Sequence, residues 1–139
     1  MPKKIDNRKL IRAALRAQRQ ARAAYSNFQV GAALLTNRGE IISGANVESA
    51  SYGLTCCAER VALFKALTEG YSKFSAIAVV SPAPGGATPC GACRQLLAEY
   101  APDIQVIVAD SRKPRVTREF TIASLLPAAF RFVPKLAKK

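Results

Sequence analysis

The chain has 139 residues, of which 50% are hydrophobic and 22% charged, and we expect one compact domain over residues 1–139. No apolar run of about 18 residues is present and Lys3 and Lys4 lead into a charged stretch, so neither a membrane span nor a secretory signal is predicted. We therefore expect a cytoplasmic protein. The formal net charge is +12 and histidine is absent, which excludes imidazole as a metal ligand or general base.

Hydrophobic periodicity and turn residues predict alternating helices and strands along the chain. In chain order these are a helix from Asp6 or Asn7 to about Ala24, a strand over 28–35, a turn over 37–39, a returning strand over 40–43, a helix from about Cys57 to Gly70, a strand over 74–80, a helix from about Gly91 to before Pro102, a strand over 104–109, a short fifth strand after the basic stretch 113–115, and a helical turn over 122–126 ended by Pro127. The expected core face of the helix after Cys57 consists of Val61, Leu63, Phe64 and Leu67. This order indicates an α/β fold in which helices cover a sheet.

Much of the positive charge lies in the first predicted helix and near the chain ends. The basic residues concerned are Lys3, Lys4, Arg8, Lys9, Arg12, Arg16, Arg19 and Arg22 near one end and Lys135, Lys138 and Lys139 near the other. Arginines at helical spacing share one face of the helix, and the opposite face is apolar. We interpret the basic face as solvated, and nonspecific binding of nucleic acid through the basic ends is the alternative.

Cys57, Cys90 and Cys93 form a pattern typical of a catalytic zinc site. A structural zinc site uses four protein ligands, whereas a hydrolytic one leaves its fourth position to water and keeps a base nearby. Glu59 stands two residues after Cys57 and is not needed as a ligand. The sequence therefore predicts one Zn²⁺ per chain, with Glu59 as the base that moves the water's proton.

The predicted helices place these thiols at two helix N-termini. Three thiolates on Zn²⁺ leave one net negative charge, which weakens the metal as a Lewis acid. The partial positive charge at a helix N-terminus offsets this effect. Arg60 is expected to donate hydrogen bonds to the thiolates without binding the metal itself.

Cys56 leaves alternatives open. Two disulfides, a zinc site with four thiolates, and a redox-active Cys90–Cys93 pair would all use the same residues. Adjacent cysteines rarely direct both side chains to one metal, and a redox pair leaves Glu59 unexplained. We expect Cys56 to be a buried small hydrophobic residue near the site.

These motifs resemble those of the cytidine deaminase family, in its small homotetrameric form that acts on free nucleosides. The matching segments are residues 25–33, 46–48, 55–60 and 89–95, together with 125–127 and Phe130. The resemblance implies a three-layer α/β/α fold with a central mixed sheet of about five strands. It also implies that zinc-activated water attacks C4 of cytosine while a glutamate that is not a ligand shuttles protons.

The resemblance implies a role for each matching residue. Cys57, Cys90 and Cys93 would hold zinc, and Glu59 would be the proton shuttle. Asn46 and Glu48 would hydrogen-bond the ribose 3′-hydroxyl, and Phe28 would stack on the pyrimidine. The other implied substrate contacts are Val47, Ala58, Tyr52 and Phe130, of which Tyr52 and Phe130 would reach the site from neighbouring subunits of a homotetramer. Taken singly, these residues also suit ordinary packing and loop solvation.

The expected reaction is the hydrolysis of cytidine and 2′-deoxycytidine to uridine and 2′-deoxyuridine with release of ammonia, as in pyrimidine salvage. The net charge suggests a polynucleotide cytosine deaminase as one alternative, although its expected histidine ligand and longer strand-binding loops are missing. A nucleoside-antibiotic deaminase of the blasticidin S type shares the zinc motifs, but Phe28 with residues 46–48 fits a plain nucleoside better. A zinc-stabilised module without activity would leave Glu59 unexplained.

Overall fold

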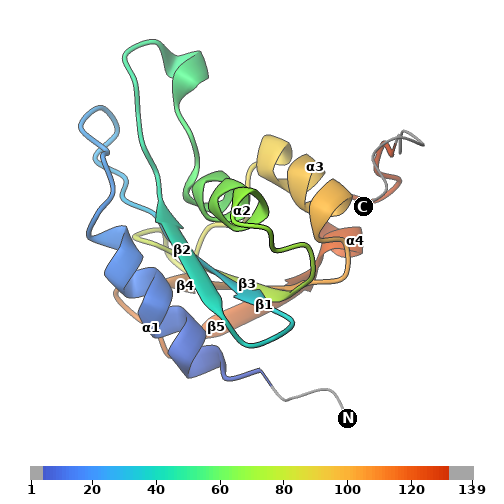
Figure 1. Ribbon diagram of the computed structural model, residues 1–139. Coiled ribbons are helices and arrows are strands. Elements are labelled where there is room, and N and C mark those ends of the chain that lie inside the picture. Colours follow the sequence, from blue (N-terminus) through green and yellow to red (C-terminus); the bar gives the residue numbers. More distant parts are fainter. Residues whose placement is uncertain (1–4, 132–139) are drawn as a thin grey trace.

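The computed structural model describes residues 5–131, which form a mixed sheet between two layers of helices (Figure 1). Its elements are α1 (Asn7–Gln18), β1 (Gly31–Thr36), β2 (Ile41–Ala45), η1 (Tyr52–Leu54), α2 (Ala58–Thr68), β3 (Phe74–Ser81), α3 (Gly91–Tyr100), β4 (Gln105–Asp110), β5 (Thr117–Thr121) and α4 (Ile122–Leu125). The strand order is β2-β1-β3-β4-β5. β3 and β4 are parallel and the other neighbouring pairs are antiparallel. The predicted three-layer fold is confirmed.

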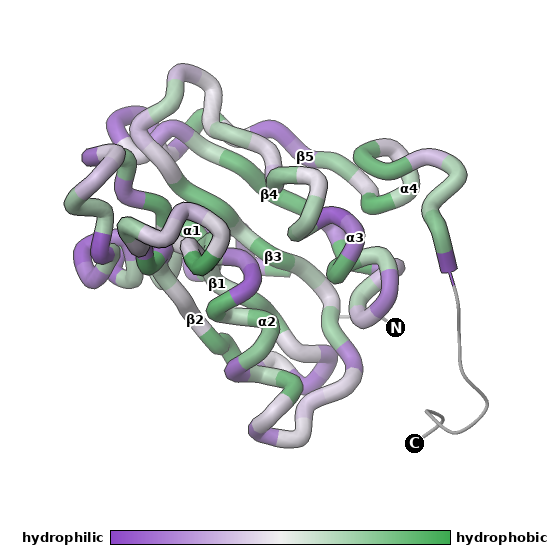
Figure 2. The backbone as a smooth tube through the Cα atoms, turned by 90° about the horizontal axis from the view of Figure 1, so that it is seen from above, coloured by the Kyte–Doolittle hydropathy of each residue, from purple (hydrophilic) through white to green (hydrophobic). Residues whose placement is uncertain are grey.

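The sheet is buried on both faces, as its nearly continuous apolar strands require. Leu34 and Ile77 point to the face covered by α2 and α3, whereas Ala33 and Ala78 point to the face covered by α1. Figure 2 shows the hydrophobic colouring that runs along the central strands. The two helical layers therefore have separate cores on opposite sides of one sheet.

Two glycines allow the helices to approach the sheet closely. A Cβ atom on Gly31 would lie 2.0 Å from the Ala14 carbonyl oxygen of α1, and one on Gly44 would lie 2.6 Å from the Ala62 backbone nitrogen of α2. Only small side chains fit beneath α2 at this separation. Its buried face accordingly contains the alanines Ala58, Ala62 and Ala66 together with Leu63.

The predicted core face of α2 is therefore wrong in part. Leu63 is buried as predicted, but Phe64 is 42% exposed and Val61 and Leu67 are only half-buried. The backbones of α2 and β2 meet closely at Gly44, where Ala58 and Ala62 face the strand, and Phe64 is left partly exposed.

Two predicted boundaries also differ from the structure. α1 ends at Gln18 and not near Ala24, because the backbone of Arg22 leaves the helical path to pair with Val47. β1 begins at Gly31 and not at Phe28, because Asn27 has a positive φ of 56° and turns the chain just before the strand. Phe28 thus precedes the sheet.

No helix within residues 5–131 is long and apolar enough to cross a bilayer. The basic residues Lys3, Lys4, Lys135, Lys138 and Lys139 lie outside the described residues.

Candidate metal centre and active site

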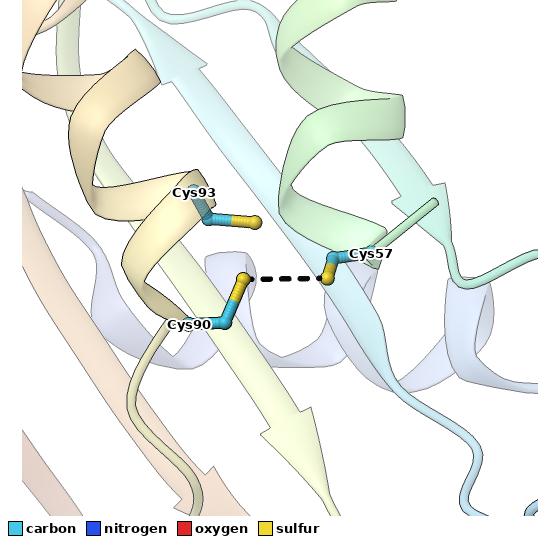
Figure 3. Close-up of side chains that lie close together, drawn as sticks. All are labelled: Cys57, Cys90 and Cys93. Atoms are coloured by element: carbon cyan, nitrogen blue, oxygen red, sulfur yellow. Dashed lines mark hydrogen bonds between the residues drawn. The ribbon is translucent and has the colours of Figure 1, made fainter. Parts of the chain in front are cut away.

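Three cysteine side chains converge where α2 and α3 begin (Figure 3). Cys57 is the N-cap of α2 and Cys90 is the N-cap of α3, while Cys93 lies in the first turn of α3. The three Sγ atoms all lie within 4.8 Å of one another. Cys56 is not part of this group and is half-buried, whereas a buried residue was predicted. All four cysteines are free thiols.

The spacing of the thiols fits a single zinc ion. Two sulfurs bound to one tetrahedral Zn²⁺ at about 2.3 Å lie about 3.8 Å apart. The Sγ atoms of Cys57 and Cys90 are separated by 3.6 Å. The cluster therefore needs little rearrangement to hold the metal.

The surroundings of Cys57 favour its thiolate form. The pKa of Cys57 is lowered to about 5, chiefly by a hydrogen bond from the Cys93 thiol, while burial opposes the shift and Arg60 and Cys90 support it. That hydrogen bond, with burial, raises the pKa of Cys93. Because metals bind the thiolate, a cysteine that is easily deprotonated favours metal binding.

Arg60 contacts the thiol cluster through Cys57. Its Nη2 atom donates to the Thr55 carbonyl oxygen at 3.1 Å and to the Cys57 Sγ atom at 3.6 Å. The Nε atom is buried without a partner among the described residues. This placement agrees with the predicted supporting role, in which a cation offsets thiolate charge.

Glu59 is a buried carboxyl group in the first turn of α2, with only 5% of its surface exposed. Its pKa is raised to about 7, chiefly by burial; its own backbone N–H and Arg60 oppose the rise, and the Cys57 thiolate contributes to it. A carboxyl with a pKa near neutrality can both accept and release a proton under ordinary conditions.

Residues 46–48 lie beside the metal centre because the backbone pairs there. Val47 exchanges two backbone hydrogen bonds with Cys56, the residue before the Cys57 thiol, at 2.8 and 3.0 Å. On its other side the segment pairs with Arg22. The fold thus brings the predicted ribose-binding segment next to a predicted ligand.

The side chains of Asn46 and Glu48 are already engaged by the loop over residues 25–30. Asn46 accepts from the Val30 N–H and donates to the Phe28 carbonyl, both at 2.9 Å. Glu48 accepts from the N–H groups of Tyr25 and Ser26 at 3.0 Å and from the Ser26 hydroxyl. The two side chains therefore shape the loop that carries Phe28, which is 37% exposed.

The remaining predicted contacts fall into two groups. Ala58 is fully buried at the start of α2, and Val47 is 47% exposed. Tyr52 is 80% exposed in the segment between β2 and α2, which projects beyond the sheet in Figure 1, and Phe130 is 72% exposed beyond α4. Within one chain, neither aromatic side chain is packed into the protein.

Sequence reasoning missed a second arginine that organises this region. Arg94 follows Cys93 and donates to the Pro89 carbonyl at 2.7 Å, the Thr88 hydroxyl at 2.8 Å and the Leu125 carbonyl at 2.8 Å. The next residue, Gln95, donates to the Phe130 carbonyl at 2.9 Å. Arg94 and Gln95 both belong to segment 89–95, which resembles a zinc motif of the family. Apart from that membership, nothing in the sequence distinguished them from ordinary surface residues.

The comparisons with known proteins agree with this geometry. The family model described as the cytidine and deoxycytidylate deaminase zinc-binding region matches residues 4–109. This chain belongs to that family. The match to this deaminase model ends before β5, so α4 and Phe130 lie beyond it.

Individual members of the deaminase family match most of the chain. The cytidine deaminase of Halalkalibacterium halodurans is 50% identical over 127 residues, which cover 91% of this chain and 95% of that protein. The crystal structure of cytidine deaminase from Burkholderia pseudomallei is 48% identical and superimposes with a TM-score of 0.86 over 91% of this chain and 100% of that one. A blasticidin-S deaminase of Bacillus cereus is 35% identical over 113 residues, covering 76% of this chain and 79% of that protein.

Proposed function

We propose that this protein is a zinc-dependent deaminase that hydrolyses cytidine and 2′-deoxycytidine to uridine and 2′-deoxyuridine, releasing ammonia. The observation that carries the proposal is a buried carboxyl group, Glu59, in the first turn of the helix whose N-cap is one of three converging thiols. A purely structural zinc site has no use for such a group. The similar proteins named cytidine deaminase support the same substrate.

In this proposal Cys57, Cys90 and Cys93 hold the metal. When bound, zinc supplies a Lewis acid that makes water acidic enough to react near neutral pH. Glu59 accepts one proton of the attacking water on a carboxylate oxygen and delivers it to the ring N3, and it then carries the proton of the resulting C4 hydroxyl to the departing amino group. The C4–N bond breaks, a C4 carbonyl forms, and nitrogen leaves as ammonia.

We assign nucleoside binding to the loop over residues 25–30 and to segment 46–48. Phe28 is exposed enough to offer its ring to a pyrimidine, and Asn46 and Glu48 hold the loop that carries it. The amide nitrogen of Asn46 retains a second hydrogen, and the Glu48 carboxylate retains acceptor capacity for a sugar hydroxyl. A phosphodiester at the same place would be repelled by Glu48, which favours a free nucleoside over an internal nucleotide.

We further propose a homotetramer in which Tyr52 and Phe130 complete the site of a neighbouring subunit. Tyr52 and Phe130 are 80% and 72% exposed, and aromatic side chains are enriched in contacts between subunits. Gln95 supports this role, since it ties the backbone of Phe130 to the helix that carries two of the thiols.

A substrate panel tests the proposed function. The zinc-loaded protein should convert free cytidine and 2′-deoxycytidine, seen as a fall in cytidine absorbance. It should leave the cytosine base, blasticidin S, and an internal cytosine in a single-stranded oligonucleotide essentially unchanged. Efficient conversion of the oligonucleotide would replace this proposal with a polynucleotide deaminase.

A further inference from the structure

A groove on the opposite side of the sheet from the thiols takes no part in the proposed reaction. It has a volume of about 500 Å³ and lies between α1 and the connection that joins β4 to β5. Its lining residues are Asn7, Arg8, Ile11, Arg12, Leu15, Pro114, Arg115 and Thr117. Volumes of this order are typical of ligand sites.

The lining combines an apolar floor with a cationic rim. Ile11 is buried and Leu15 and Pro114 are half-buried, whereas Arg8, Arg12 and Arg115 are exposed. Within residues 5–131, none of these three guanidinium groups forms an ion pair; the ion pair found there joins Arg112 to Asp110. Three cations thus gather from two distant segments, and the described part of the chain gives them no ion-pair partner.

The charge continues past the groove along the same helix. Arg16 and Arg19 are exposed at the spacing that extends the row from Arg8 and Arg12. From Arg8 to Arg19 this row spans about 16 Å, which is longer than a single nucleotide. We propose that the groove and this row bind the phosphates of a single-stranded nucleic acid, with a base resting on the apolar floor.

One acidic residue sets a limit on where the phosphates lie. Asn7 at the edge of the groove donates to the Glu119 carboxylate at 2.8 Å. A phosphate would avoid this end and lie along the arginine rim, because like charges repel. Removing the Glu119 charge should therefore strengthen binding.

The test measures binding of a labelled single-stranded oligodeoxyadenylate, which contains no pyrimidine for the proposed active site, at several salt concentrations. Five phosphate contacts, one for each arginine of the groove and the row, give a slope of about −3.5 in log affinity against log salt, so affinity should fall ~100-fold between about 50 and 200 mM salt. Arg12→Gln with Arg115→Gln leaves three contacts and a slope of about −2, so the same change in salt should cost only ~20-fold. Glu119→Gln should bind more tightly than the wild type.

A matched variant separates the groove from general charge. Arg38→Gln with Lys73→Gln removes the same charge from exposed positions outside the groove and should keep the wild-type salt slope. Retained zinc and cytidine turnover in all variants would show that they fold, and the binding readout does not depend on the deaminase reaction. An unchanged slope in the groove variant, or an equal change in the matched variant, would overturn the proposal. If free adenylate displaces the labelled oligonucleotide at equal phosphate concentration, the groove binds a mononucleotide, which would also overturn the proposal.

Discussion

The thiol of Cys56 differs from the other three in its surroundings. It lies outside the cluster, its backbone pairs with Val47, and burial raises its pKa. Cys57→Ala, Cys90→Ala and Cys93→Ala should each lose most bound zinc, whereas Cys56→Ala should keep about one ion per chain. Metal analysis after gel filtration checks this. Retention of zinc by Cys57→Ala with its loss from Cys56→Ala would reverse the ligand assignment.

The hydrogen bonds to Glu48 make part of the stability dependent on pH. The Ser26 hydroxyl and N–H, with the Tyr25 N–H, lower the pKa of Glu48, so its stabilising effect is present above the unfolded-state pKa and is lost as pH falls through the folded-state value. Ser26→Ala should raise that pKa and lower the free energy of unfolding at neutral pH. This pH-dependent loss should disappear in acid, where Glu48 is protonated.

Urea unfolding at a series of pH values measures the effect, with Ser26→Thr as the control that keeps a hydroxyl. A pH-independent part of the loss is also expected, about 1 kcal/mol, because the Phe28 N–H donates to the Ser26 hydroxyl. A constant difference between Ser26→Ala and the wild type at every pH would contradict the coupling to Glu48.

Arg94 links two elements that no local pattern joins. It ties the residues before Cys90 to the end of α4 through three hydrogen bonds. Arg94→Gln should weaken zinc affinity by about 10–100-fold, since groups that support metal ligands commonly contribute this much. Saturating zinc should restore most of the turnover.

A chelator competition titration measures that affinity, and exposed Arg38→Gln serves as the control. Unaltered zinc affinity in Arg94→Gln would mean that Arg94 only packs α3 against α4. The folded fraction is followed by circular dichroism, so that loss of metal is not confused with unfolding.

At the level of elements, the sequence predicted every strand and α-helix, but it did not predict η1 or where some of the other elements begin and end. Apolar runs identify β3 and β4 because buried strands need them, and this holds whatever surrounds the strand. The end of α1 depends on the pairing of Arg22 with Val47, and the exposure of Phe64 depends on the close approach of α2 to Gly44. Both partners are distant in sequence. Helical periodicity carries no information about those partners.

The same distinction applies to the site. The spacing of Cys57, Glu59, Cys90 and Cys93 predicted a cluster, and the structure brings the three thiols together. Sequence reasoning gave no sign that Asn46 and Glu48 already bind the backbone of residues 25–30, because those hydrogen bonds join segments about 20 residues apart. The groove formed by α1 and the β4–β5 connection was missed for the same reason.

At the level of the whole molecule, we propose that neighbouring subunits complete the site of each chain. The proposed homotetramer should appear by light scattering at the concentration used for the assay. Tyr52→Ala and Phe130→Ala should lower turnover while each chain keeps its zinc, because these side chains lie on the surface and outside the cysteine cluster. A fully active monomer would contradict shared sites and leave the proposed chemistry intact.

The proposed mechanism requires Glu59 to move protons at a zinc site held by three cysteines. Glu59→Gln keeps the size of the side chain but cannot accept and release a proton, so zinc content and nucleoside binding should remain close to those of the wild type. The measurement is the loss of cytidine absorbance by wild type and Glu59→Gln at equal zinc content. We predict that turnover falls at least about 10²–10⁴-fold in the variant. Near-normal turnover by fully metallated Glu59→Gln would contradict the account.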